Sequence, residues 1–352
     1  MGRAYRIAVI GGDGIGPEVT DAALSVLDAS EKRFGFRTER TPVDWSAEKY
    51  ATGFRVTPEM IEPLRSYDAI LLGAIGHPDA PRGLPEADII FGLRRGFDLY
   101  VNLRPIVLYD DRLCPLKGRS TKDVDIVVVR ENTEDVYGRP IEVEAEGTPD
   151  EAVWSKMIFT RRGTERIVRY AFEVARTRPR KRLTLVDKAN ALRLQDIYRR
   201  VLEEVGREYP DVEHDAMYVD ACSMWMVLHP ERFDVIVTTN LFGDIITDLG
   251  AAIVGGLGTG ASGNIHPGKV SVFEPIHGSA PKYTGQGVAS PVGAIGALAL
   301  MLDHVGERDA AKAIDRAIRE GFSSGRIKGV EAGSGRTMDV AAGIARTVAE
   351  GT

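Results

Sequence analysis

Cysteine, basic excess and long apolar runs are all scarce in this sequence of 352 residues. The two cysteines, Cys114 and Cys222, form no CxxC pair and are too few for a disulfide framework or a cysteine-ligated metal site. A net charge of −6 argues against an extended nucleic-acid groove, although it is compatible with a local positive pocket for a small acid. No apolar run is long enough to cross a membrane, and the first residues lack the apolar stretch of a secretion signal. We therefore expect a cytoplasmic protein without nucleic-acid or membrane partners.

Short β-branched runs, such as RIAVI at 6–10, alternate with longer segments of helical periodicity, such as 161–177. The strand-like runs are apolar without alternation, which predicts an α/β fold with a largely parallel sheet covered on both faces. A chain of this length is expected to form two lobes with a cleft between them. Two segments interrupt the rhythm: Tyr137–Thr160 is predicted to leave the main body, and Gly255–Gly268 is predicted to be a flexible loop that approaches a ligand.

The glycines near the N-terminus imitate a dinucleotide-binding fingerprint. A strand leads into Gly12, Gly14 and Gly16, and Pro17 suits the first turn of the helix that follows. The spacing is G-x-G-x-G, however, and not the G-x-G-x-x-G of a pyrophosphate cradle. We therefore exclude a standard Rossmann fold and interpret these glycines as a tight strand-to-helix turn.

Three arginines, Arg94, Arg104 and Arg130, are candidates for binding a carboxylate substrate. Guanidinium forks bind carboxylates in a bidentate manner, so three of them together would hold a di-acid. Arg130 closes an apolar strand, where ligand crevices of α/β proteins form. The alternative is that these are solvated surface arginines.

Three aspartates are candidates for binding a metal. Asp244 and Asp248 are four residues apart in a helical pattern, which points both carboxylates the same way, and Asp220 ends the predicted strand MYVD. Oxygen ligands without nearby His or Cys favour Mg²⁺ or Mn²⁺ over zinc. The alternative for the pair is one helix-capping and one solvated aspartate.

Lys188 and Tyr137 follow predicted strands at crevice positions. Either side chain can transfer protons once a neighbouring cation lowers its pKa. Taken alone, each is equally explained as a structural residue.

The stretch EPIHGSAPKYTGQG, from Glu274 to Gly287, places Lys282 and Tyr283 among small residues. Small residues let a backbone approach a ligand closely, and a lysine among them can bind a phosphate. The alternative is a solvated loop lysine.

Taken together, the motifs GDGIGPEV, NLRP, VVRENTE, VDKAN, FDVIVTTNLFGDIITDLGAA and EPIHGSAP resemble those of the β-hydroxyacid oxidative decarboxylases, in the same order and spacing. That family comprises the isocitrate, isopropylmalate, homoisocitrate and tartrate/D-malate dehydrogenases. The resemblance implies a homodimer with shared active sites that binds its dinucleotide outside the Rossmann scheme. It also implies a large cofactor-binding lobe of residues 1–98 and 252–352, a smaller dimerisation and catalytic lobe of residues 99–251, and an intersubunit clasp at 137–160.

The resemblance also implies a role for each candidate residue. Tyr137, with Lys188 of the second subunit, corresponds to the acid/base pair. The three arginines and Asp220 correspond to substrate ligands, and the metal ligands correspond to Asp244, Asp248 and Asp220 of the second subunit. The implied cofactor-binding residues are Glu274, His277, Gly278, Ser279, Ala280, Lys282, Tyr283 and Ser290.

Lys282 favours NADP as the cofactor. Relatives that use NAD carry an aspartate there, which binds the ribose hydroxyls, whereas NADP-using isocitrate enzymes carry the same Ala-Pro-Lys-Tyr as this chain. A lysine attracts a 2′-phosphate that a carboxylate would repel. Met338 and Ala342 replace the Tyr and Arg that reinforce the phosphate site in those relatives, so NAD remains the alternative.

Ile90 and Phe91 stand where isocitrate enzymes present polar groups to a third carboxylate, and they favour an alkyl branch on the substrate. Burial of an alkyl group gains ~0.8 kcal/mol per CH₂, whereas a carboxylate buried against these side chains is penalised. A 3-alkylmalate, with 3-isopropylmalate first, is therefore expected. Ala87, Phe91 and the sequence RENTE depart from the usual isopropylmalate pattern, which leaves tartrate or D-malate, then homoisocitrate or isocitrate, as alternatives. A regulatory subunit without catalysis is disfavoured, because the acid/base pair and the aspartates are present.

Overall fold

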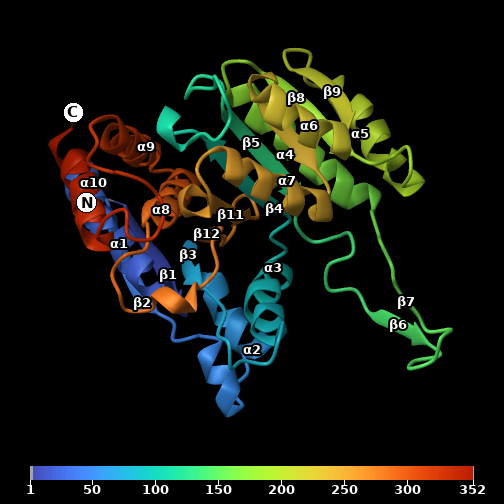
Figure 1. The fold of residues 1–352 in the computed structure, drawn as a ribbon, viewed down its shortest axis with the longest axis horizontal. Coiled ribbons are helices and arrows are strands. Elements are labelled where there is room, and N and C mark those ends of the chain that lie inside the picture. The colour runs from blue at the N-terminus through green and yellow to red at the C-terminus, as the bar shows by residue number, and fades with distance from the viewer. Residues whose placement is uncertain (1–2, 352) are drawn as a thin grey trace.

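A ten-stranded sheet runs through the molecule, as the computed structural model of residues 3–351 shows (Figure 1). The strand order is β2-β1-β3-β12-β11-β4-β5-β10-β8-β9. Most neighbouring strands are parallel, and the antiparallel pairings are those that β4 and β11 make at the centre of the sheet. The predicted α/β class with a largely parallel sheet is confirmed. The strands are β1 Ala4–Gly12, β2 Arg37–Pro42, β3 Ala69–Ala74, β4 Val101–Val107, β5 Asp125–Glu131, β8 Arg182–Asp187, β9 Glu213–Tyr218, β10 Val235–Thr238, β11 Ala261–Ile265 and β12 Val272–Pro275.

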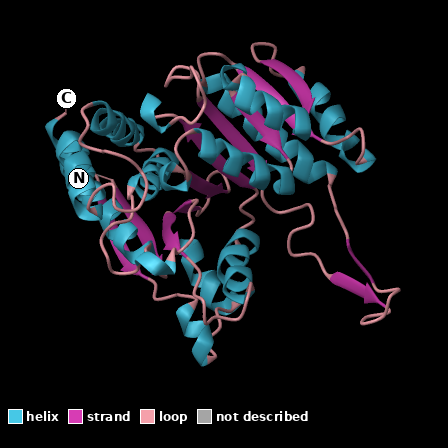
Figure 2. Ribbon diagram, in the orientation of Figure 1, coloured by secondary structure: helices cyan, strands magenta, loops and turns pink. Residues whose placement is uncertain are grey.

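The helices cover both faces of this sheet (Figure 2). Helix α1 begins at Gly16 with Pro17 in its first turn and ends at Gly35, whose φ of 77° gives a left-handed cap. Helices α1 and α10 pack together beside the paired ends of the chain (Figure 1). The helices are α1 Gly16–Phe34, α2 Pro58–Ile61, α3 Phe91–Gly96, α4 Arg161–Thr177, α5 Asp196–Gly206, α6 Val219–Leu228, α7 Asn240–Ile253, α8 Val292–Val305, α9 Arg308–Ser323 and α10 Thr337–Glu350.

The sheet divides between β11 and β4 into halves that come from different parts of the chain. Strands β1, β2, β3, β11 and β12 come from residues 1–98 and 252–352, and β4, β5, β8, β9 and β10 come from residues 99–251. The two groups meet at the centre of the molecule, where β11 pairs with β4, and extend from there in different directions (Figure 1). The lobe boundaries implied by the family resemblance stay a prediction, since one continuous sheet joins the two groups.

The segment Tyr137–Thr160 leaves the main body as a hairpin (Figure 1). It pairs β6 Ile141–Glu144 with β7 Ala152–Ser155 in an antiparallel ribbon. Every residue of these two strands is exposed, including Ile141 and Trp154. A two-stranded ribbon with exposed apolar residues is marginal by itself, so this hairpin is suited to contact another surface.

The prediction of a flexible loop at Gly255–Gly268 is wrong for its second half. Ala261–Ile265 forms β11, which is buried along its length between β4 and β12. The glycines there serve close packing: a Cβ on Gly260 would lie 2.2 Å from the Ile276 side chain. The small residues that suggested flexibility are therefore explained by close packing around a buried strand.

The predicted strand MYVD ends earlier than expected. Strand β9 stops at Tyr218, and Asp220 lies in the first turn of α6. A carboxylate is favourable there, because the N-terminus of a helix carries partial positive charge. No helix within residues 3–351 is long and apolar enough to span a membrane.

Candidate active site

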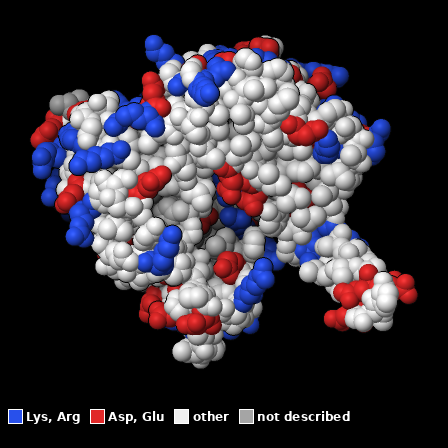
Figure 3. Space-filling view, viewed as in Figure 1, with Lys and Arg blue, Asp and Glu red and all other residues white. Residues whose placement is uncertain are grey.

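The three predicted arginines converge from separate elements. Arg94 lies in α3, directly after a π-helical turn at Glu86–Ile90, Arg104 lies in β4, and Arg130 lies next to the end of β5. Arg130 is 2% exposed, and the other two are also nearly buried. Figure 3 shows basic and acidic side chains gathered in the hollow between the two halves of the molecule.

The three arginines lie close to two carboxylates, those of Asp244 and Glu274. Arg130 Nη1 lies 2.5 Å from Asp244 Oδ1, and Arg104 Nη1 lies 3.6 Å from the same oxygen. Arg94 Nη2 lies 3.6 Å from Glu274 Oε1. Three buried cations thus face two carboxylates, which leaves a net positive site for an acidic ligand.

The crowding of these cations is visible in their pKa values. Burial, reinforced by Arg130 and Arg94, lowers the pKa of Arg104 to about 10. Burial also lowers the pKa of Arg94. Because a bound dicarboxylate would relieve this repulsion, the cluster favours an acidic ligand.

Tyr137 joins the cluster through Asp244. Its hydroxyl donates to Asp244 Oδ2 at 2.8 Å. Burial and this carboxylate raise the pKa of Tyr137 to about 12, so its proton is retained at neutral pH. Burial would raise the pKa of Asp244, but Arg130 and Tyr137 outweigh burial and hold it below its usual value. The site therefore pairs a protonated phenol with an ionised carboxylate.

Phe91 forms an apolar wall next to these polar groups. Its ring centroid lies 6.1 Å from that of Tyr137, and the Arg94 guanidinium carbon lies 5.5 Å from the Phe91 ring. Ile90 ends the π-helical turn and lines a narrow gap beside Arg94 and Glu274. Both residues that were predicted to contact the alkyl substituent of the substrate, Ile90 and Phe91, thus lie beside the arginine cluster.

Asp248 follows Asp244 by one helical turn on α7, as predicted. Asp248 is exposed and makes no hydrogen bond or ion pair with the rest of residues 3–351. Two carboxylates on one helix face suit a hard divalent cation. No group of three potential metal ligands occurs within the described part of one chain, so these two aspartates fit a metal that takes a further ligand from elsewhere.

Lys188 and Asp220 form a separate pair within the chain. Lys188 follows β8, and its Nζ lies 2.9 Å from Asp220 Oδ1 on α6. The hydrogen bond from Lys188 holds the pKa of Asp220 below its usual value. Asp220 has a side chain that is 66% exposed. The structure thus brings these two predicted residues together, but not with Asp244 of the same chain.

Three loops meet at the carboxyl ends of the adjacent parallel strands β1, β3 and β12. The Ile15 N–H donates to Ser279 O at 2.8 Å, and a Cβ on Gly14 would lie 2.0 Å from that oxygen. A Cβ on Gly76 would lie 3.1 Å from Ser279 Oγ. These contacts place backbone where ligands of open α/β sheets bind.

The predicted cofactor residues lie along the last of these loops. His277 Nδ1 contacts Gly278 O at 3.0 Å, while its Nε2 is buried without a partner in the described chain. Ala280 has a φ of 41°, and Lys282 is exposed with its Nζ 4.6 Å from the Tyr283 ring centre. The unpaired His277 nitrogen and the open backbone fit a nucleotide. Ser290 lies further on, where its hydroxyl contacts Gly258 O at 3.5 Å.

Two positioning residues escaped the sequence analysis. Asn240 Oδ1 accepts from Nε and Nη2 of Arg130, and Thr247 Oγ1 accepts from Arg104 Nη1 at 2.7 Å. Both lie on α7, on the same side as Asp244. Their spacing of seven residues, with Asp244 between them, is the signal that identifies one helix face.

A positive pocket beside a backbone cradle, on this two-part α/β sheet, is typical of an enzyme that acts on an acidic small molecule. A family model described as isocitrate/isopropylmalate dehydrogenase matches residues 6–343, and the chain belongs to this family. The resemblance expected from the motifs is thereby confirmed. Members of the family are decarboxylating dehydrogenases that depend on a metal and a nicotinamide cofactor.

Individual relatives agree with this assignment. The chain is 47% identical to a 3-isopropylmalate dehydrogenase of Thermobifida fusca, over 99% of both chains. It is 50% identical to a 3-isopropylmalate dehydrogenase of Mycobacterium avium, over 89% of this chain and 92% of the relative. The crystal structure of isocitrate dehydrogenase from Methylococcus capsulatus superimposes with a TM-score of 0.85 at 37% identity, covering 98% of this chain and 99% of the other.

Proposed function

We propose that this enzyme oxidises and decarboxylates a 3-alkyl-substituted (2R)-malate, with 3-isopropylmalate as its first candidate substrate. The arginine cluster next to Phe91 carries the proposal, because three guanidinium groups suit two carboxylates while an aromatic wall suits an alkyl branch. Two relatives named 3-isopropylmalate dehydrogenase support this choice.

The residues of the site divide the chemistry between them. Arg94, Arg104 and Arg130 hold the malate carboxylates in one orientation. Lys188 of a second copy accepts the proton of the C2 hydroxyl, and a nicotinamide ring held at the backbone cradle would accept the C2 hydride. The C3–carboxyl bond then breaks, CO₂ leaves, and the electron pair remains on C3 and the adjoining carbonyl. Tyr137, protonated at neutral pH, donates its proton to C3.

The metal site is proposed to form between two copies of the chain. Asp244 and Asp248 of one copy, with Asp220 of the second, would hold Mg²⁺ or Mn²⁺. When bound, such a cation supplies charge stabilisation at the substrate oxygen. This arrangement accounts for the absence of a third acidic ligand near Asp244 within residues 3–351 of one chain.

Exposed apolar side chains support the homodimer. Asp220, Met224 and Leu228 are spaced by four residues on α6, and Met224 and Leu228 are half exposed. Ile245, between the two aspartates of α7, is also exposed. Such a face on adjacent helices is typical of an interface, and a two-fold contact there would carry Asp220 of each copy toward the other's Asp244. The segment 137–160, which contains the exposed hairpin of β6 and β7, is the proposed clasp.

A panel of kcat/KM values tests the substrate assignment. With Mn²⁺ present, 3-isopropylmalate is expected to exceed D-malate, tartrate, isocitrate and homoisocitrate. Each substrate is measured with NADP and with NAD by the absorbance at 340 nm. A highest kcat/KM with isocitrate would show that Ile90 and Phe91 do not contact the C3 substituent of the substrate. A highest kcat/KM with D-malate or tartrate would assign the enzyme to the tartrate/D-malate dehydrogenases.

The cofactor is proposed to be NADP, because Lys282 is exposed beside the nucleotide cradle with no carboxylate partner in the described chain. The variant Lys282→Asp should lower the NADP/NAD ratio of kcat/KM by at least about tenfold, since a carboxylate repels the 2′-phosphate. Lys122→Asp, at an exposed lysine that precedes β5 in the other half of the sheet, is the matched control and should leave the ratio unchanged. A wild-type enzyme that prefers NAD contradicts the proposal.

A further inference from the structure

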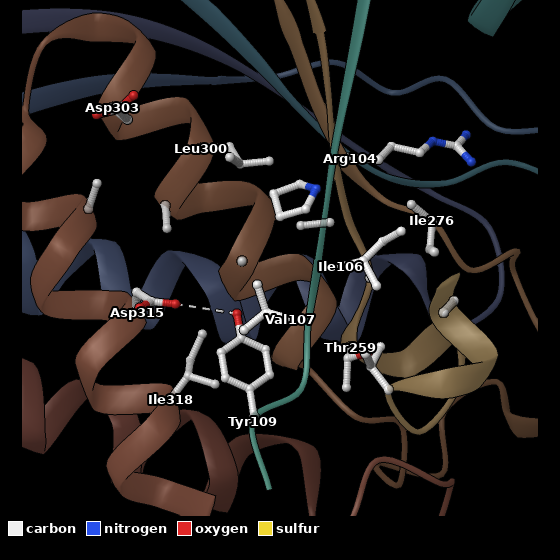
Figure 4. A pocket seen from close by; sticks show the side chains of 18 of the residues that line it. Arg104, Ile106, Val107, Tyr109, Thr259, Ile276, Leu300, Asp303, Asp315 and Ile318 are labelled. Carbon is white, nitrogen blue, oxygen red and sulfur yellow. Dashed lines mark hydrogen bonds between the residues drawn. The ribbon is translucent and has the colours of Figure 1, made fainter. Parts of the chain in front are cut away.

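A second cavity lies on the other side of β4 from the arginine cluster. It measures about 420 Å³ and is enclosed by β4 and α7 on one side and by α8 and α9 on the other. Figure 4 shows the guanidinium of Arg104 directed away from Leu300 and Tyr109, which line the cavity. The body of the cavity therefore lies away from the Arg104 guanidinium, and its size is that of a small-molecule site.

The body of this cavity is aliphatic. Its walls combine branched side chains with small residues such as Ala299 and Gly296 on α8, which leave room between the helices. Val107 and Leu300 are only partly buried, because they face this space and not packed protein. Water would find few hydrogen-bond partners among these aliphatic side chains, so the cavity favours an apolar ligand. The branched wall residues are Ile106, Val107, Val254, Ile276, Leu300 and Ile318.

The rim of the cavity carries net positive charge. Lys312 and Arg316 lie four residues apart on α9, are exposed, and make no hydrogen bond or ion pair with the rest of residues 3–351. Asp315 contacts Tyr109 and also accepts from Arg319 Nε at 2.8 Å, so its charge is neutralised within the protein. Asp303 is the remaining acidic group of the lining. Two like charges at this spacing repel each other, and an anion between them would relieve the repulsion.

We propose that this cavity is a second binding site, for an amphipathic monocarboxylate with an aliphatic body of about six to ten carbons. The aliphatic body fills the space between α8 and α9, and the carboxylate lies between Lys312 and Arg316. Nothing in this proposal depends on the reaction at the arginine cluster, since binding requires no turnover.

Two residues connect this cavity to the active site. Thr247 and Arg104 both line it, and the Arg104 Nη1–Thr247 Oγ1 hydrogen bond joins them. Arg104 also faces Asp244. A ligand packed against Thr247 therefore alters the surroundings of Arg104, and by thermodynamic linkage the two sites affect each other's affinity.

Calorimetric titration of the full-length wild-type protein with octanoate tests the site. We expect a dissociation constant below about 1 mM, and binding of octylammonium at least tenfold weaker. The double variant Lys312→Gln/Arg316→Gln should weaken octanoate at least fivefold, whereas Arg200→Gln/Arg207→Gln, at exposed cations of α5 and its C-cap beside β8, should not. Equal binding of octanoate and octylammonium would overturn the charge assignment.

The variant Ala299→Phe fills the cavity and tests its location. Octanoate binding should be lost, with a thermal midpoint that confirms the fold, and binding that survives would overturn the site. In the wild type, octanoate should change the KM for the hydroxy acid at least twofold, an effect absent from Ala299→Phe. An unchanged KM would overturn the connection through Arg104. Calorimetry remains readable without turnover, so failure of the proposed substrate is distinguishable from failure of this site.

Discussion

The arginine cluster at Asp244 and the Lys188–Asp220 pair are built in opposite ways, although each joins cations to a carboxylate. Arg130 is 2% exposed and is held by Asn240 as well as by Asp244. Asp220 is 66% exposed, and Lys188 is its only ion-pair partner among residues 3–351. The buried arginines contact Asp244 and Glu274 of their own chain, whereas Asp220 of the exposed pair remains open to a second copy.

This difference indicates how the two halves of the site are assembled. Buried charges must be paired within the fold, because an uncompensated ion in the interior is costly. Exposed charges tolerate an incomplete environment until another surface covers them. The Lys188–Asp220 pair, on an exposed surface beside apolar α6, is therefore expected to function in the proposed site of a second copy.

Removing Arg130 should have the largest effect. Arg130→Met removes the guanidinium that donates to Asn240 and Asp244, so the unfolding free energy should fall by about 3 kcal/mol. The kcat/KM should fall by about a hundredfold to a thousandfold. Denaturant titration and steady-state kinetics measure the two effects, with exposed Arg95→Met as the control. A variant of unchanged stability would show that the cluster is not held together as described.

Removing Lys188 should affect catalysis alone. Lys188→Met should lower kcat by about a thousandfold, because the proton acceptor for the C2 hydroxyl is lost. Its thermal midpoint should stay within about 2 °C of wild type, since its ion pair is exposed. Scanning calorimetry beside the rate assay checks this separation. Loss of stability equal to that of Arg130→Met would remove the contrast between the two regions.

A charge on the apolar face of α6 should have a smaller effect, which depends on concentration. Met224→Glu introduces a carboxylate into the proposed interface, so light scattering should detect monomers, and specific activity should fall at least about tenfold in dilute solution. Met338→Glu is a matched control for the light scattering, because both methionines are 49% exposed and Met338 lies on α10. Dimers that persist in Met224→Glu would place the interface elsewhere.

Much of this site could be predicted from the sequence because strand ends carry its chemistry. Apolar runs predicted β5 and β8, and parallel strands bring residues such as Arg130 and Lys188 to related edges of one sheet. The helical spacing of Asp244 and Asp248 was equally visible. Local pattern and motif together therefore predicted the arginines, the aspartates and the fold class.

What the sequence could not show depends on contacts between distant segments. Ala261–Ile265 contains small residues that imitate a flexible loop, and only the crowding by Ile276 and Phe273 explains them as a buried strand. Thr247 resembles any helix threonine until Arg104, from a strand 143 residues away, is placed beside it. In both cases the structural role depends on residues that are distant in the sequence and adjacent only in the fold.

Co-expression of Lys188→Met and Arg130→Met chains tests the shared site most directly. In a mixed dimer, one site combines an intact Arg130 from one copy with an intact Lys188 from the other, while the second site lacks both. Random pairing should therefore restore about one quarter of the wild-type activity, since half of the dimers are mixed and each holds one intact site. Activity no higher than that of the separate variants would contradict the account and place Lys188 in the active site of its own chain.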